Sequence, residues 1–165
     1  MDIYVHYIKS FIIFDTKKDV NMFSKACEYG IKASVYIVEH SLKNEKVSLK
    51  DVAKAIDSPE AYTSKILQQL SRINLIQSEK GPAGGFSIDE SKIAETNLSS
   101  IVYAIDGDSI YRECGLGFHE CDESKPCVIH NQYKSIRNDL KIMLESTSLK
   151  DLSEDINNGL SFLKR

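Results

Sequence analysis

The most informative part of the chain for its fold reads Leu75-Ile76-Gln77-Ser78-Glu79-Lys80-Gly81-Pro82-Ala83-Gly84-Gly85-Phe86. Its centre, residues 81–85, predicts a tight hairpin tip, because glycine allows positive φ and proline fixes its own φ. The residues on either side, 75–80 and 86–88, predict two short strands joined by that tip. Lys80 stands at the tip, where its side chain can reach a phosphate or the minor groove of DNA.

Two short helices are predicted directly before the hairpin. Ser48, with Asp51 three residues later, forms a capping box that begins the first of them. Ser58 and Pro59 begin the second, with the serine as N-cap and the proline at the first helical position. Two short helices joined by a tight turn make a helix-turn-helix, and a strand pair directly after it is a wing.

Further helices are predicted from apolar residues at helical spacing. A long helix from about Phe23 to Ser41 comes first, a short one spans 97–105, and Ser148 with Asp151 caps a last one. The predicted inward positions before the wing are Ala26, Cys27, Gly30, Ile31, Ala33, Val35, Ile37, Val38, Leu49, Val52, Ala53, Ile56, Tyr62, Ile66, Leu70 and Ile73. Those after it are Leu98, Ile101, Val102, Ile105, Leu149, Leu152, Ile156, Leu160 and Leu163.

The exposed side of the second short helix, together with the wing, is the candidate DNA-contacting surface. Short hydroxyl side chains and a lysine can hydrogen-bond to base edges or phosphates without clashing. A plain solvated helix face has the same composition, and the wing decides in favour of DNA. The candidate residues are Ser48, Ser58, Glu60, Ala61, Thr63, Ser64, Lys65 and Gln68 in the helices, and Lys80, Gly81, Pro82 and Gly84 in the wing.

A long helix from about Cys127 to Glu145 is predicted to pair with a partner helix. Five apolar residues on it are spaced 4, 3, 4, 3, which is the heptad spacing of a helix packed along another helix. They are Ile129, Tyr133, Ile136, Leu140 and Met143. This seam predicts a homodimer.

Three cysteines lie between the winged domain and the pairing helix. Six residues separate Cys114 from Cys121, and five separate Cys121 from Cys127. Thiolates are the ligands that iron–sulfur clusters prefer, and the Cys-x2-Cys pairs of a structural zinc site are absent from the sequence. His130 lies one helical turn after Cys127 and is the local candidate for a fourth ligand. Zinc is the competing metal in a purified sample, because three cysteines and a histidine also suit it.

The composition limits the compartment and the number of domains. The chain has 165 residues, 42% hydrophobic and 27% charged, which suits one packed domain or a domain with an appendage. A formal net charge of -3 requires any DNA contact to come from a local basic face. Four cysteines without a secretory signal indicate a reducing, cytoplasmic compartment. The fourth of them, Cys27, is predicted to be a buried structural thiol.

The chain divides into three predicted segments. Residues 1–21 form an N-terminal extension whose apolar run is too short to span a membrane, with Met22 as an alternative start. Residues 22–96 form the winged helix-turn-helix domain, and residues 97–165 form the cysteine-loop sensor and the dimerisation helices. The fold class is therefore mainly α, with a small two-stranded wing and a long C-terminal dimerisation helix.

From about Phe23 to Ile156 the chain resembles the Rrf2 family of winged-helix transcription regulators, which includes an iron–sulfur regulator of cluster assembly and a nitric-oxide-sensing repressor. The resemblance rests on the wing stretch, on residues 48–53 with Tyr62 and Leu70, and on the cysteine triplet. It implies a dimeric DNA-binding repressor that carries an iron–sulfur cluster. A histidine ligand at position 130 resembles the [2Fe–2S] members and favours that cluster over [4Fe–4S].

Departures from the family pattern affect the target sequence and the fourth ligand. Lys80 replaces the wing arginine, and Ser64 replaces a base-reading glutamate, so the operator of the cluster-assembly regulator is not expected here. Asn74 replaces a glycine and still tolerates a left-handed conformation. Glu28 resembles the acidic residue that completes the nitric-oxide sensor's site from the other subunit, so it rivals His130 as the fourth ligand.

The function expected from sequence is a DNA-binding transcriptional regulator, a repressor, controlled by an iron–sulfur cluster. The alternative is a regulator of the same family that is apo or zinc-bound and responds to another signal or partner. Enzymatic activity is not expected, because three neighbouring thiols in a winged-helix context, without an evident oxyanion donor, do not suit nucleophilic catalysis.

Overall fold

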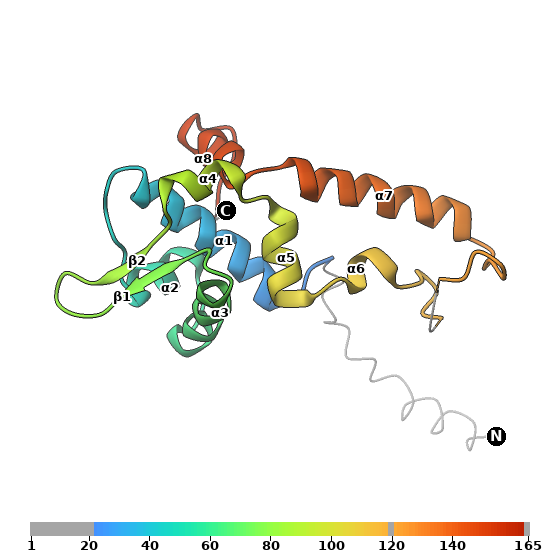
Figure 1. The fold of residues 1–165 in the computed structure, drawn as a ribbon, viewed down its shortest axis with the longest axis horizontal. Helices are drawn as coiled ribbons and strands as arrows, with labels where there is room; N and C mark the ends of the chain where they lie inside the picture. Colours follow the sequence, from blue (N-terminus) through green and yellow to red (C-terminus); the bar gives the residue numbers. More distant parts are fainter. Residues whose placement is uncertain (1–21, 119–120, 164–165) are drawn as a thin grey trace, which may run out of the picture.

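The computed structural model describes residues 22–118 and 121–163, so the predicted extension at 1–21 lies outside the described residues. The described chain is mainly helical with one two-stranded antiparallel sheet, which confirms the predicted fold class (Figure 1). The elements are α1 (Lys25–Ser41), α2 (Leu49–Ile56), α3 (Glu60–Arg72), β1 (Gln77–Glu79), β2 (Gly85–Ser87), α4 (Glu90–Glu95), α5 (Leu98–Asp106), α6 (Ser109–Arg112), α7 (His130–Ser146) and α8 (Leu149–Asn157).

The hydrophobic core surrounds α1, which contacts α2, α3, α5 and α8. Gly30 allows the close approach of α5, since a Cβ atom there would lie 2.2 Å from Cδ1 of Ile105. The start of α1 is also tied to the end of α5, because the backbone N–H and the hydroxyl of Ser24 both donate to the carboxylate of Asp106. The winged domain and α5 therefore form one packed unit.

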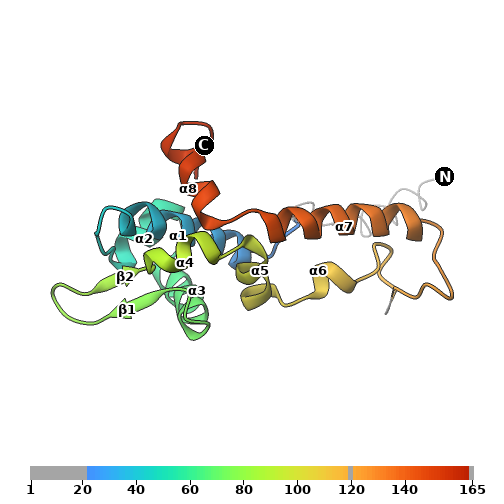
Figure 2. The ribbon, with the colours of Figure 1, turned by 45° about the horizontal axis from the view of Figure 1, so that its top comes forward.

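The long helix α7 extends away from this packed unit (Figures 1 and 2). Its C-terminal end contacts α5, and the short helix α6 packs along it. The cysteine loop joins α6 to α7 at the far end of the molecule, and α8 then returns to pack on α1 and α4. Within residues 22–118 and 121–163, no helix is long and apolar enough to cross a bilayer.

The predicted wing is present with shorter strands than expected. Residues Gln77 and Ser87 pair at one end of the ladder, and Glu79 and Gly85 pair at the tip end. The tip closes with a hydrogen bond of 2.9 Å from the N–H of Gly84 to the carbonyl of Gly81, whose φ of 109° suits glycine. At 2.5 Å, the Lys46 ammonium pairs with the Glu79 carboxylate and joins the wing to the loop before α2.

The capping boxes that begin α2 and α8 are confirmed, but the predicted start of α3 is wrong by one residue. Pro59 is the N-cap of α3, and Ser58 makes no capping bond. The Ser58 hydroxyl is buried and has no hydrogen-bond partner among the described residues. Instead, the hydroxyl of Thr63 donates to the carbonyl of Pro59 at 3.1 Å.

Three residues predicted to face inward are exposed. Tyr62 keeps 37% exposure because it lies at the edge of α3, with its ring 5.8 Å from that of Tyr29. Ile73, at 45%, follows the last residue of α3, and Leu160, at 74%, follows the end of α8. The structure also adds α4 and α6, two short helices that the periodicity did not predict, and begins α7 at His130 rather than Cys127.

Candidate nucleic-acid interface and cysteine site

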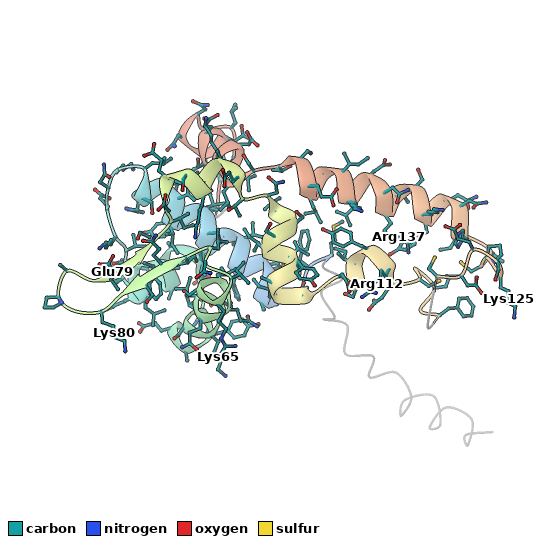
Figure 3. The ribbon with its side chains drawn as sticks, in the orientation of Figure 1. Lys65, Glu79, Lys80, Arg112, Lys125 and Arg137 are labelled. Carbon is teal, nitrogen blue, oxygen red and sulfur yellow. The ribbon has the colours of Figure 1, made fainter. Side chains whose placement is uncertain are left out.

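The predicted DNA-contacting residues lie at the start of α2, just before and along α3, and in the wing. In Figure 3, Lys65 and Lys80 lie at the same end of the molecule, opposite the cysteine loop. Both are exposed and therefore available to a phosphate backbone. The other exposed candidates are Ser48, Glu60, Ala61, Gln68, Gly81 and Pro82, and the half-buried ones are Ser64 and Gly84.

Two of the predicted DNA contacts are wrongly placed. Thr63 is fully buried, because it stands three and four residues before Ile66 and Leu67 on the core face of α3. The Ser58 hydroxyl is buried as well. Neither side chain is available to DNA in this conformation, so the exposed contacts of α3 reduce to its first turn, Lys65 and Gln68.

The predicted metal ligands line one pocket of about 330 Å³ in the cysteine loop. The Sγ atoms of Cys114 and Cys127 lie 3.9 Å apart, and Cys121 Sγ lies 3.4 Å from Nδ1 of His130. Cys114 and His130 are buried, while Cys121 and Cys127 are half-buried. Residues that the sequence analysis missed also line this pocket, namely Phe118, Asp122, Lys125 and Pro126.

The four predicted ligands, Cys114, Cys121, Cys127 and His130, are arranged as two pairs. In the part of the chain that the structure describes, no group of three His, Cys, Asp or Glu side chains could hold a single metal ion. Glu28, the alternative ligand, pairs with Lys25 at 2.9 Å on the first turn of α1 and is not among the residues lining the pocket. The predicted intrachain ligands therefore come together around one pocket, without converging on one point.

Two of the cysteines, Cys114 and Cys27, have opposite electrostatic environments. A hydrogen bond from the backbone N–H of Leu116 lowers the pKa of the Cys114 thiol, and a bond from Phe118 acts in the same direction. Burial raises the pKa of Cys27 to about 12, with Asp106 adding to the rise. A low pKa favours the thiolate that metals bind, whereas Cys27 is held as a neutral thiol in the core. The prediction that Cys27 is a buried structural thiol is confirmed.

The residues of the predicted dimer seam differ in how far they are buried within this chain. Tyr133 and Leu140 are half-buried and face α5 and α6, next to the fully buried Leu144. By contrast, Ile136 and Met143 remain 63% and 44% exposed, and Ile129 is half-buried just before the helix begins. The seam thus packs partly within the chain and leaves a narrow apolar edge, Ile129, Ile136 and Met143, at seven-residue spacing.

A helix-turn-helix followed by a wing, with a separate helical extension, defines a winged-helix DNA-binding transcriptional regulator. The comparison with protein families identifies the family to which this regulator belongs. The model of the Rrf2 family, described as an iron-dependent transcriptional regulator, matches residues 23–155, and the chain belongs to this family.

Relatives with known names agree with this assignment. A protein of Aquifex aeolicus, whose name places it among the HTH-type transcriptional regulators, is 27% identical over 136 residues, covering 79% of this chain and 90% of the relative. The HTH-type transcriptional regulator IscR of Vibrio cholerae is 22% identical, and the match covers 77% of this chain and 72% of the relative.

Solved structures show the same fold. CymR, the global cysteine regulator of B. subtilis, superposes with a TM-score of 0.65 at 22% identity, covering 80% of this chain and 95% of that one. IscR of T. potens superposes with a TM-score of 0.64 at 21% identity, and the match covers 84% of this chain and 90% of that one.

Proposed function

We propose that the chain is a homodimeric repressor whose affinity for DNA is controlled by an iron–sulfur cluster held by Cys114, Cys121, Cys127 and His130. The observation that supports this most directly is that these four donors line one pocket and form two close pairs. The family's description as iron-dependent supports it as well.

The spacing within each pair suits two ligands on one tetrahedral metal ion. Two thiolates on tetrahedral zinc lie about 3.8 Å apart, and a thiolate and an imidazole nitrogen lie about 3.6 Å apart, for zinc–sulfur and zinc–nitrogen lengths of about 2.3 and 2.0–2.1 Å. The observed separations are 3.9 Å for Cys114 and Cys127 and 3.4 Å for Cys121 and His130. The two pairs together would hold a [2Fe–2S] cluster, which we prefer over [4Fe–4S].

The cluster, when bound, would supply a redox-active and oxidant-sensitive centre. The residues of the chain would hold the loop against α7, with His130 fixed at its first turn. A change in the restraint on α7 would alter how two copies of the chain are paired. Because half-sites on DNA are read one helical turn apart, a change in the separation of two α3 helices would change operator affinity.

Two alternatives remain distinct from this proposal. Glu28 of a second subunit would replace His130 as the fourth ligand if the dimer brought it to the pocket. A regulator of the same family that is apo or zinc-bound would answer to another signal or partner, and the absence of a three-donor group among the described side chains fits only the apo form. Metal analysis separates the metal-binding possibilities.

Anaerobic purification tests the proposal. The wild-type protein should be coloured, with about two irons and two sulfides per chain, and should shift a promoter fragment in a manner that changes when the colour is bleached by oxidant. Cys121→Ala should lose the colour. Cys27→Ala serves as the matched control, since Cys27 is buried in the core outside the loop. A colourless, iron-free wild type that binds the promoter normally would exclude control by a cluster.

A further inference from the structure

Arg137 on α7 is a residue that the sequence analysis did not single out. In Figure 3 it lies on the side of α7 that faces α6. Its Nη1 donates to the carbonyl oxygen of Glu113 at 2.9 Å and lies 3.5 Å from that of Arg112, while its Nη2 lies 3.6 Å from Sγ of Cys121. One guanidinium therefore contacts both ends of the segment between α6 and the second cysteine.

These contacts use the particular geometry of arginine. The last carbonyls of a helix have no partner within the helix, and Arg112 and Glu113 stand at the end of α6. A planar guanidinium with five N–H donors can satisfy these carbonyls and still direct another N–H at the sulfur of Cys121. The single ammonium of a lysine lacks this fork.

Tyr133, one turn earlier on α7, adds to the same contact. The guanidinium carbon of Arg137 lies 5.8 Å from the centre of the Tyr133 ring, within the range of a cation–π interaction. The ring in turn packs against Gly115, where an added Cβ would lie 2.8 Å from two ring carbons. Tyr133 and Arg137 thus hold the loop on either side of Cys114.

We propose that Arg137 is a positioning residue that fixes Cys121 and the end of α6 against α7, and so couples the cysteine loop to the helix that carries the exposed edge. Ile136, which belongs to that edge, is its direct neighbour in sequence. A rotation of α7 would therefore move the Cys121 thiol and the edge together. The proposal extends the cluster-controlled function above, but its structural part is independent of any bound group.

Hydrogen exchange on metal-free full-length protein tests this positioning role. Arg137→Gln should raise the exchange rate of the backbone amides of residues 113–117 by about tenfold, since a charged hydrogen-bonding group is lost. Arg137→Lys should not restore the protection, because the fork and not only the charge is required. Arg112→Gln is the matched control: the Arg112 side chain pairs with Asp108, the N-cap residue of the same short helix, and the Arg112 carbonyl stays in place.

The same variants distinguish this inference from the cluster proposal. After anaerobic reconstitution with iron and sulfide, Arg137→Gln should lose its visible absorption about tenfold faster than wild type and Arg112→Gln. Faster exchange in Arg137→Gln together with a wild type that takes up no iron would support the positioning role and reject the cluster. Exchange equal to that of wild type, or full restoration by Arg137→Lys, would overturn the positioning role.

Discussion

Ile136 and Ile142 are both 63% exposed on α7, yet their side chains project about 120° apart around the helix axis. Ile136 lies at seven-residue spacing from Ile129 and Met143, whereas Ile142 stands away from that line. Substitutions at these two residues therefore distinguish a specific role in helix pairing from the general effect of changing an exposed apolar side chain.

Ile136→Glu should weaken homodimerisation. A buried, unpaired carboxylate at the centre of a helix–helix contact is costly, and we expect the dimer dissociation constant to rise at least about a hundredfold. Analytical ultracentrifugation over a concentration series would measure it. Ile142→Glu should leave the constant within about threefold of wild type. An unchanged dissociation constant for Ile136→Glu would place the interface on another surface.

A replacement of His130 by cysteine identifies the fourth ligand. Histidine ligands raise the reduction potential of a [2Fe–2S] centre relative to all-cysteine ligation, so His130→Cys should keep the colour and lower the potential by on the order of 100 mV. A redox titration followed by visible absorption would measure this change. Glu28→Gln should leave the potential unaltered if His130 is the ligand. The reverse result would assign the role to Glu28 of the partner subunit.

The wing lysine should act through DNA phosphates. Lys80→Ala is expected to weaken binding to any DNA sequence and to reduce the slope of log K against log salt concentration by about one. Fluorescence anisotropy at several salt concentrations would give this slope for the wild type and for Lys80→Ala. Lys150→Ala is the control, since Lys150 is an exposed lysine on α8 that pairs with Glu154, one helical turn later, at 3.8 Å. An unchanged slope for Lys80→Ala would mean that the wing does not touch the backbone.

Most of the fold followed from local signals in the sequence. The capping boxes at Ser48 and Ser148 and the glycine-rich tip at 81–85 have short-range causes, and the structure contains all three. Thr63 was misplaced because short hydroxyl residues were assigned to the surface by type, although its spacing from Ile66 assigns it to the core.

The cysteine site was predictable only in part. The predicted ligands stand out by residue type and spacing, whereas the contacts of Arg137 depend on where the loop folds back on α7. These two contacts join residues 24 and 16 positions apart, and no periodic pattern predicts them. The division of the heptad seam is similar, because the spacing of Tyr133 and Ile136 does not reveal which of them packs within the chain.

Cys27 should make the stability of the protein depend on alkaline pH. Its pKa rises from 9.0 to about 12 on folding, chiefly through burial. A raised folded-state pKa stabilises the fold fully below pH 9.0, and this contribution is lost as the pH increases toward 12. Between these limits the unfolded thiol is ionised while the folded one is not, which costs about 1.4 kcal/mol per pH unit.

Urea unfolding of metal-free protein at pH 8, 9, 10 and 11, in steps of about one pH unit, would measure how the free energy of unfolding depends on pH. Cys27→Ala should be less stable than wild type at pH 8, because a buried sulfur is lost, but its free energy of unfolding should fall less steeply above pH 9. The three loop cysteines are common to both proteins, so their titration cancels in the comparison. Parallel curves for the two proteins would show that the Cys27 thiol does not remain protonated in the folded core.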